Sequence, residues 1–335
     1  MHESPKLVEW ISARVNGLEG HRLMVVLAAP GCHWASQSGG CTNCSFPSFF
    51  GVDEPVERRA YERQMDAALA TMPADPVGPV QLDLYVSGSF FCVEEVPADA
   101  QEALLRRAAA APGVCRIVVE TRPEYVDLAT AERARHAVGD VPLEVAIGLE
   151  TADDAIRLER IRKGFSWANF VDSARILVAS GLQPSVHLLL KPIDTTEGEA
   201  VADAVTSIER VATLAQEVGQ TIHISLQPCF VAPDTPLETA FDQGRYRPPW
   251  LWSVIEVIRR TADLAPIHVG LSDEGMGVAR SAHNCPDCTD TILTALAGYN
   301  RSGDSAGLEA LECHCVSSWQ RAMATASNTP PLCRP

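Results

Sequence analysis

The stretch Leu23-Met-Val-Val-Leu-Ala-Ala29, followed by Cys32-His-Trp-Ala-Ser-Gln-Ser-Gly-Gly-Cys41-Thr-Asn-Cys44, decides how the rest of the chain is interpreted. Its first seven residues are an apolar run that predicts a buried strand. The three cysteines that follow have C-x8-C-x2-C spacing in a Gly-rich segment. Thiolate ligands select zinc, copper(I) or iron–sulfur clusters. Because a structural zinc site is closed by four protein ligands, three cysteines predict a metal centre with an open coordination position.

The composition of the chain narrows the class of protein. It has 335 residues, 46% of them hydrophobic, and a formal net charge of −16. We expect neither a signal peptide nor a membrane span, because no apolar run has the required form or length. Eleven cysteines grouped at metal-ligand spacings favour a reducing, cytoplasmic location over a disulfide scaffold. The acidic charge argues against a broad nucleic-acid surface and favours a small-molecule substrate.

Six apolar runs alternate with helix-like segments and predict the fold class. Crossovers of this length return the chain in the same direction, which predicts a parallel α/β sheet. Six units are fewer than the eight of a complete barrel, so we predict a partial (β/α)6 TIM-like barrel over residues 21–230. The expected strands are residues 22–28, 82–87, 114–119, 143–149, 184–190 and 222–227, and the expected helices are residues 55–72, 97–111, 127–137, 152–162, 167–181 and 197–218.

The two ends of the chain are expected to lie outside this barrel. Residues 1–20 are predicted to form an amphipathic leader helix. Residues 231–335 are predicted to form a cysteine-rich, mainly helical C-terminal extension. Its expected elements are a helix ending near residue 263, a short strand over residues 267–270, and helices near residues 286–299 and 306–326.

Polar or small residues close most of the predicted strands. In α/β barrels and open sheets, active-site residues gather at the C-terminal ends of the strands. One such residue alone is better explained as a capped strand end, but several beside a cysteine loop predict a polar pocket. Lys163 and Lys191 are two of only three lysines, and lysine is a compact donor whose pKa shifts readily. The strand-end residues are Ser87-Gly-Ser89, Glu120-Thr-Arg122, Glu150, Lys191 and Gln227-Pro-Cys229.

A second cysteine set, Cys285-Pro-Asp-Cys288 with Cys313-His-Cys315, predicts a closed four-ligand metal site. Four-cysteine sites hold either zinc or an iron–sulfur cluster, and we prefer zinc while the auxiliary cluster remains open. A sulfur-donating auxiliary cluster would change the reaction to C–S bond formation. The remaining cysteines are expected to be ordinary buried or peripheral thiols, namely Cys92, Cys115, Cys229 and Cys333. Of these, Cys229 is also a candidate for the site, because it follows a strand end facing the predicted pocket.

Four motifs give the chain a family resemblance. The cysteine loop, Tyr85-Val-Ser-Gly-Ser-Phe-Phe91, Val119-Glu-Thr-Arg-Pro-Glu-Tyr125 and Glu144-Val-Ala-Ile-Gly-Leu-Glu-Thr151 closely resemble the radical S-adenosylmethionine (SAM) enzymes. The nearest branch is the radical subunit of archaeosine synthase, a relative of the Elongator catalytic subunit. The usual spacing in these enzymes is C-x3-C-x2-C, and the longer first gap of this chain is shared by the archaeosine branch.

The resemblance implies a cofactor arrangement. Cys32, Cys41 and Cys44 would hold a [4Fe–4S] cluster whose fourth iron binds SAM. A reductant such as flavodoxin or ferredoxin would supply the electron that cleaves SAM to methionine and a 5′-deoxyadenosyl radical, which abstracts hydrogen from a substrate. The residues implied to bind SAM are Ser87, Gly88, Ser89, Glu120, Arg122, Glu150 and Gln227, and the candidate catalytic residues are Lys163, Lys191, Arg122 and Cys229.

Four hypotheses for the function follow. The first is radical, lyase-type C–N bond cleavage on a small biosynthetic intermediate. The second is archaeosine-type modification of a lysine adduct of a 7-deazaguanine base in tRNA, with a basic partner protein supplying the nucleic-acid contacts. The third is C–S bond formation at an auxiliary cluster. The fourth is a non-catalytic, metal-stabilised binding module.

Overall fold

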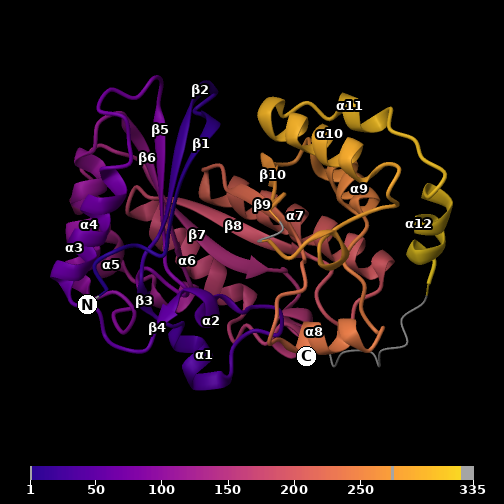
Figure 1. Cartoon of the computed structure of the whole chain (residues 1–335), viewed down its shortest axis with the longest axis horizontal. Helices are drawn as coiled ribbons and strands as arrows, with labels where there is room; N and C mark the ends of the chain where they lie inside the picture. The colour runs from indigo at the N-terminus through magenta and orange to yellow at the C-terminus, as the bar shows by residue number, and fades with distance from the viewer. Residues whose placement is uncertain (1, 273–274, 326–335) are drawn as a thin grey trace. The chain divides into compact units, whose positions relative to one another are not determined.

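The computed structural model describes residues 2–272 and 275–325 and confirms the predicted α/β class (Figure 1). The chain divides into two compact units, each described here by itself. Unit 1 takes in the residues up to Gly40, Phe46–Gly148 and Ala168–Ser185, and unit 2 takes in Cys41–Ser45, Leu149–Trp167 and the residues from Val186 onward. Within the described ranges, the helices are too short or too polar to cross a membrane. Cys333 lies outside the described residues.

The main sheet has eight strands in the order β1-β2-β5-β6-β7-β8-β9-β10. Strands β2, β5, β6 and β7 pair in parallel, and so do β9 and β10. All six strands predicted from the apolar runs are present, and the sheet has one further strand at each edge. The bounds are β1 Leu7–Val15, β2 Leu18–Val26, β5 Val80–Tyr85, β6 Val114–Thr121, β7 Leu143–Glu150, β8 Gln183–Leu190, β9 His223–Pro228 and β10 Ile267–Val269.

The predicted leader helix is wrong, because residues 7–15 form the edge strand β1. This strand pairs antiparallel with β2 over its whole length, from Leu7 opposite Val26 to Val15 opposite Leu18. The two strands are joined at Asn16 and Gly17, which have φ angles of 53° and 79°. Asn-Gly is a preferred sequence for tight hairpin turns that need positive φ. The hairpin gives β1 backbone hydrogen-bond partners on β2 over its whole length, and this outweighs the helix-like spacing of the apolar residues.

The sheet of unit 1 has one apolar and one polar face. Leu82 and Leu84 flank Asp83 on β5, Ile117 and Val119 occupy the matching positions of β6, and all four apolar side chains are completely buried. Helices α3 (Arg58–Leu69), α4 (Ala98–Ala110) and α5 (Leu128–Val138) lie on one side of β5 and β6 (Figure 1). Burial of apolar surface between sheet and helices is the main stabilising contribution in such a layer. The remaining elements of this unit are α1 His33–Ser38, α2 Phe46–Phe50, β3 Ala29–Pro30, β4 Gly51–Val52, a 3₁₀ turn at Pro123–Tyr125, and most of α6 (Trp167–Ala179).

The opposite face of the same strands carries paired charges. Arg22 on β2 pairs with the fully buried carboxylate of Asp83 on β5, and Arg116 on β6 pairs with Glu144 on β7. Successive strand residues alternate between faces, so Glu120, four residues after Arg116, lies on this face too. The polar face of the sheet therefore runs toward the strand ends at which the sequence predicts the site.

Unit 2 contains the predicted helical extension. The long helix α7 has the bounds expected from the sequence, Glu197–Val218, and begins with a capping box between Thr196 and Glu199. The predicted helix 152–162 shrinks to a π-helical turn, Ile156–Arg160. The predicted helix 306–326 is interrupted at the second cysteine pair, and residue 326 lies outside the described residues. The remaining elements are α8 Pro236–Asp242, α9 Leu251–Thr261, a 3₁₀ turn at Val278–Arg280, α10 Thr289–Ser302, α11 Ala306–Glu309 and α12 Val316–Met323.

Candidate functional site

The first cysteine of the loop is held through a buried carboxylate in unit 1. Cys32 immediately precedes α1, and the Glu95 carboxylate accepts the next backbone N–H, that of His33, at 2.9 Å. Its other oxygen accepts the Ser89 N–H at 2.6 Å. Glu95 is only 1% exposed, and burial raises its pKa to about 7 against the lowering effect of these hydrogen bonds. One side chain therefore joins the Cys32 segment to the turn after β5.

The end of β6 joins the same arrangement. The Ser89 hydroxyl accepts the Arg122 backbone N–H at 3.2 Å, and the Phe90 N–H donates to the Glu120 carbonyl at 2.8 Å. The Arg122 guanidinium lies 4.6 Å from the centre of the Trp34 ring, within the range of a cation–π interaction. Unit 1 therefore brings together the Cys32 segment, the Ser87–Ser89 turn and the end of β6, as the sequence predicts.

Gly88 is required by a protein side chain. A Cβ atom at this position would lie 2.1 Å from the nearer Glu95 carboxylate oxygen. The small residues of this turn are expected from the sequence to let a ligand approach the backbone. In the structure, the Glu95 carboxylate fills the space beside Gly88. Glu95 itself was missed, because an acidic residue in Val93-Glu-Glu-Val96 has no local pattern that signals burial.

The second part of the cysteine loop is anchored within unit 2. Thr42, next to Cys41, donates its N–H to the Ile161 carbonyl at 3.0 Å and its hydroxyl to the Arg160 carbonyl at 2.8 Å. Its own carbonyl accepts the Leu237 N–H at 3.1 Å. Cys41 packs against an apolar cluster that includes Cys229, Leu237 and Tyr246. These contacts fix the backbone on the C-terminal side of Cys41.

Cys229 lies in this apolar cluster and is 1% exposed. Burial raises the pKa of its thiol to about 12. The thiolate is the reactive form of cysteine, so the environment keeps Cys229 in its unreactive form at neutral pH. Its predicted catalytic role stays a prediction.

Glu150 and Lys163 form an ion pair at the end of β7. The Lys163 ammonium lies 2.7 Å from the Glu150 carboxylate, and both side chains are about 15% exposed or less. Glu150 has a φ angle of 64°, in the left-handed region that side-chain-bearing residues rarely adopt. Strained backbone of this kind concentrates at functional sites, and the roles predicted for Glu150 and Lys163 stay predictions.

Lys191 directly follows β8 and has the same backbone feature, a φ angle of 66°. Its ammonium lies 2.6 Å from the carboxylate of Glu197, which is 3% exposed. Glu197 also accepts the Trp250 N–H at 2.8 Å and the Ser253 hydroxyl at 2.6 Å. Each of the two lysines singled out in the sequence thus pairs with a carboxylate. Lys163 pairs with Glu150 at the end of β7, and Lys191 pairs with Glu197 at the start of α7.

Gln227, predicted on the SAM side of the site, lies at the end of β9. Its amide nitrogen donates to the Ser225 hydroxyl at 2.7 Å. A Cβ atom at Gly270 would lie 1.8 Å from the Gln227 amide oxygen, so Gln227 packs against the backbone that follows β10. Its role toward SAM stays a prediction.

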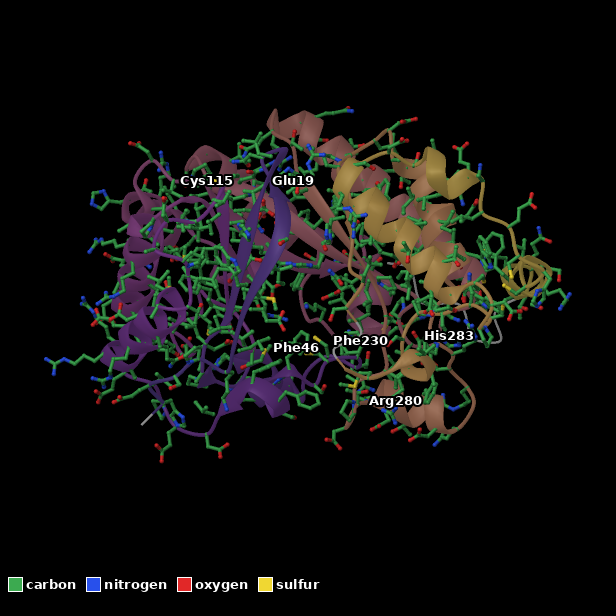
Figure 2. The ribbon with its side chains drawn as sticks, turned by 45° about the horizontal axis from the view of Figure 1, so that its top comes forward. Glu19, Phe46, Cys115, Phe230, Arg280 and His283 are labelled. Atoms are coloured by element: carbon green, nitrogen blue, oxygen red, sulfur yellow. The ribbon has the colours of Figure 1, made fainter. Side chains whose placement is uncertain are left out.

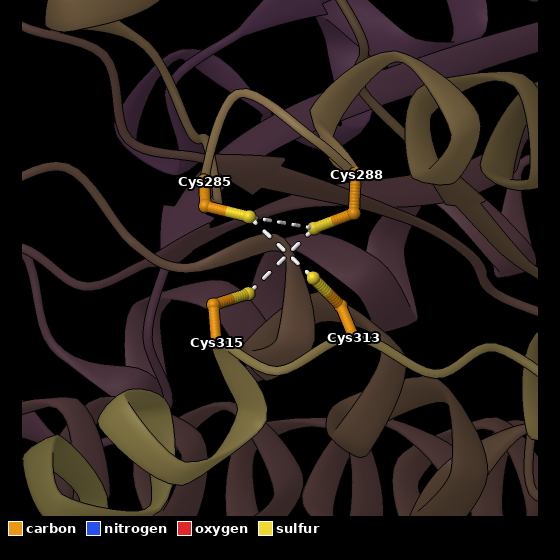
Figure 3. Close-up of side chains that lie close together, drawn as sticks. All are labelled: Cys285, Cys288, Cys313 and Cys315. Atoms are coloured by element: carbon orange, nitrogen blue, oxygen red, sulfur yellow. Dashed lines mark hydrogen bonds between the residues drawn. The ribbon is translucent and has the colours of Figure 1, made fainter.

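The four C-terminal cysteines converge as predicted (Figure 3). The sulfur–sulfur distances are 3.7 Å for Cys285 and Cys288, 3.5 Å for Cys285 and Cys313, and 3.6 Å for Cys288 and Cys315. The Trp252 indole N–H donates to the Cys315 sulfur at 3.2 Å. A tetrahedral ion with metal–sulfur bonds of about 2.3 Å places its four sulfurs about 3.8 Å apart. The donor set and its spacing therefore fit one thiophilic metal ion.

The loop that leads into this metal site is fixed to the rest of unit 2. His283, labelled in Figure 2, lies two residues before Cys285, and its carbonyl accepts a hydrogen bond from the Arg247 guanidinium at 2.9 Å. The Arg247 guanidinium carbon in turn lies 4.0 Å from the centre of the Trp250 ring. The approach to the first cysteine of the set is therefore anchored by Arg247.

The profile of the Radical SAM superfamily matches residues 26–205, more than half of the chain. The chain therefore belongs to the radical SAM superfamily of enzymes, and its cofactors are a [4Fe–4S] cluster and SAM. This confirms the family resemblance seen in the motifs. The C-terminal cysteines form an additional site with the capacity for zinc or a second cluster.

Two curated relatives extend the similarity beyond the matched domain. The chain is 33% identical to archaeosine synthase subunit beta of Methanosarcina acetivorans over 92% of this chain and 87% of that one. It is 31% identical to archaeosine synthase subunit beta of Thermococcus kodakarensis over 93% of this chain and 94% of that one. The similarity includes the C-terminal extension, because matches of this length reach well past the barrel.

One solved structure supports the fold. An Elp3 protein from Methanocaldococcus infernus superposes with a TM-score of 0.51 at 15% sequence identity, covering 88% of this chain and 65% of that one, less than two thirds of its length. Together with the family match, this confirms the predicted partial TIM-like barrel.

Proposed function

We propose that this protein is the radical SAM subunit of an enzyme that modifies a 7-deazaguanine base in tRNA, and that it acts with a partner subunit. The observation that carries the proposal is the similarity to two archaeosine synthase beta subunits over more than 90% of this chain. The designation of those relatives as subunits supports the partner. These relatives favour the tRNA hypothesis over the small-molecule substrate that the net charge of −16 suggested.

The partner accounts for the charge. Proteins that bind tRNA neutralise phosphates with lysine and arginine, and this chain has 27 of these residues against 43 acidic ones. The described part of the chain also commits many of its arginines to internal pairs, among them Arg22, Arg116, Arg157 and Arg280. We infer that the partner subunit supplies most of the phosphate contacts and that this chain supplies the radical chemistry.

Each part of the site has a role in this proposal. Cys32, Cys41 and Cys44 hold the [4Fe–4S] cluster, which with SAM supplies a 5′-deoxyadenosyl radical. The Ser87–Ser89 turn and Arg122 orient SAM at the ends of β5 and β6. Glu150 and Lys163 hold opposite charges together at the end of β7, where they orient a polar group of SAM or of the base. The bond broken is the C–N bond of a lysine adduct on the base, which leaves an amidine.

The reconstituted full chain tests this function. The chain is reduced anaerobically with SAM and is given tRNA carrying the lysine adduct of the 7-deazaguanine base, or the free base adduct, each with and without the partner subunit. We expect 5′-deoxyadenosine and the amidine product, measured by mass spectrometry, from tRNA in the presence of the partner. Equal turnover of the free base adduct would overturn the tRNA assignment. The Cys32→Ala variant is the control.

Zinc is our proposal for the second site. The sulfur spacing of 3.5–3.7 Å supports a single ion, because a cluster inserts its own iron–sulfide core between the thiolates and moves them further apart. The same sulfur spacing disfavours C–S bond formation, because that reaction needs the auxiliary cluster. Elemental analysis of the reconstituted protein tests it: we expect one zinc per chain, and a second set of four irons would contradict the proposal.

A further inference from the structure

We infer that Glu95 is a positioning residue that fixes the Cys32 segment against the Ser87–Ser89 turn and thereby sets the affinity for SAM. Its two carboxylate oxygens accept one backbone N–H from each segment, at 2.9 Å from His33 and at 2.6 Å from Ser89. The inference rests on the proposed cluster at Cys32. The two segments are far apart in the sequence, and this carboxylate bonds to the backbone of both, while the Ser87 hydroxyl adds a longer hydrogen bond of 3.4 Å to the Pro30 carbonyl.

Glu95 is itself held in place. The Tyr61 hydroxyl donates to the Glu95 backbone carbonyl, and the absence of a side chain at Gly88 leaves room for the carboxylate. A Cβ at Gly88 would lie within 2.6 Å of three carboxyl atoms, so the pocket is shaped to this group. The adjacent Glu94 differs in burial and in backbone contacts, because it is exposed and its carboxylate accepts the Cys92 thiol instead of a backbone N–H of the two segments.

Glu95 belongs to a closed ring of contacts that also includes Ser89, Arg122, Trp34 and His33. Ser89, which donates its N–H to Glu95, accepts the Arg122 N–H through its hydroxyl. The Arg122 guanidinium lies over the ring of Trp34, and Trp34 follows His33 in the chain. Because each member has partners on both sides, displacement of one segment requires the others to move. Loss of Glu95 opens this ring at the point nearest to Cys32.

The position of the ring determines which property should change. SAM would contact the cluster held by Cys32 and the turn at Ser87–Ser89 at the same time, so its affinity depends on their separation. Assembly of the cluster depends on the three cysteines themselves. Residues that orient metal ligands without touching the metal typically contribute tenfold or more to binding or activity. We therefore expect Glu95→Gln to weaken SAM binding about tenfold and to leave the iron content unchanged.

Hydrogen exchange in the metal-free protein tests the contacts alone. A glutamine keeps the shape of Glu95, but its NH2 group is a donor and cannot accept both backbone N–H groups. We expect the amide of His33 or of Ser89, whichever is left facing the NH2 group, to exchange about tenfold faster in Glu95→Gln than in wild type, because the single glutamine oxygen accepts only one of the two N–H groups. Glu94→Gln is the matched control. Unchanged exchange at both amides would overturn the inference.

Binding measurements on the reconstituted full chain test the consequence. We expect Glu95→Gln to keep the wild-type iron content and to require about ten times more SAM for half-saturation, measured by isothermal titration. Equal SAM affinity in Glu95→Gln and Glu94→Gln would overturn the proposed role. If Glu95→Gln fails to fold by circular dichroism, Gly88→Ala replaces it, because its Cβ displaces the carboxylate. A wild-type chain without iron would instead refute the proposed cluster, whatever the exchange experiment shows.

Discussion

The two groups of cysteines in this chain are held in place by different kinds of contact. The four C-terminal cysteines meet through their side chains, with sulfur atoms 3.5–3.7 Å apart within one unit. The cysteines of the N-terminal loop are held through the backbone, by Glu95 beside Cys32 and by Thr42 beside Cys41. A closed site has only to bring its sulfurs together, whereas an open site has to place its ligands relative to the groups that bind a second molecule.

The four-cysteine site also organises the helices around it. Cys288 occupies the N-cap position of α10, and Cys315 occupies that of α12. The Cys315 sulfur accepts the indole N–H of Trp252 on α9. On α12, Trp319 donates to the Ser253 hydroxyl at 2.9 Å, and Ser253 donates to Glu197, the partner of Lys191. The closed site is thus connected by hydrogen bonds to a predicted residue of the open site.

The largest expected effect is the loss of the catalytic cluster. Changing Cys32, Cys41 and Cys44 together to alanine should remove the four irons of one cluster and abolish formation of 5′-deoxyadenosine. Zinc at the C-terminal site should remain, because its ligands lie in a separate set. Metal analysis of the reconstituted variant measures both. Cys115→Ala is the control, and retention of all iron in the triple variant would contradict the assignment.

Removal of one ligand from the closed site should destabilise the fold. Cys288→Ser should release zinc and lower the free energy of unfolding by several kcal/mol, because binding of a structural zinc contributes about 10–16 kcal/mol in small domains and only part of it is lost with one ligand. Thermal unfolding with zinc quantification measures the effect. His314→Ala changes an exposed neighbour of the same site and should have little effect. A Cys288→Ser variant with wild-type stability would show that the site is not structural.

The third expected effect concerns the buried ion pair between Lys191 and Glu197, which links the four-cysteine site to a predicted residue of the open site. Lys191→Met leaves the Glu197 carboxylate buried without its counter-ion, which should cost about 3–5 kcal/mol in the free energy of unfolding. The double variant Lys191→Met, Glu197→Gln should recover much of this loss. Urea unfolding of both single variants and the double variant measures their coupling. Strictly additive effects would show that the two residues do not act as a pair.

The smallest expected effect is a pH dependence near the end of β7. Desolvation raises the pKa of Asp203 to about 7, while a hydrogen bond of 2.6 Å from the Thr151 hydroxyl opposes the shift. The folded state therefore binds this proton more tightly than the unfolded state, so the contribution of Asp203 to stability is present at low pH and is lost as the pH rises from about 4 to 7.

The comparison of wild type with Asp203→Asn isolates this contribution. Relative to the variant, wild type should lose about 1–2 kcal/mol of stability between pH 4 and pH 7. This is less than the roughly 4 kcal/mol of an unscreened rise in pKa from about 4 to about 7, because Asp203 is only half-buried. Urea unfolding at several pH values measures the difference. A constant difference across this range would show that the pKa of Asp203 is not raised in the folded protein.

Local patterns in the sequence accounted for most of the fold. The six strands of the alternation lie within a few residues of their predicted positions, and α7 has the predicted bounds. The largest exception is β1, whose apolar residues have helix-like spacing and whose partner strand decides its conformation. The helices expected over residues 152–162 and 306–326 are also shorter or interrupted. The Asn16-Gly17 turn was the available signal, because this dipeptide favours a tight hairpin.

The sequence by itself determined the cysteine spacing and the strand ends, since both depend on residues close together in the chain, and the cluster ligands inferred from that spacing remain a prediction. The SAM and catalytic residues chosen from these strand ends remain predictions. The tertiary structure alone decided which charges are paired and which are buried. Glu95 and Glu94 are indistinguishable in the sequence, yet one is 1% exposed and the other lies at the surface. The reason is that burial and pairing depend on contacts between residues such as His33 and Glu95, 62 positions apart, which no local pattern encodes.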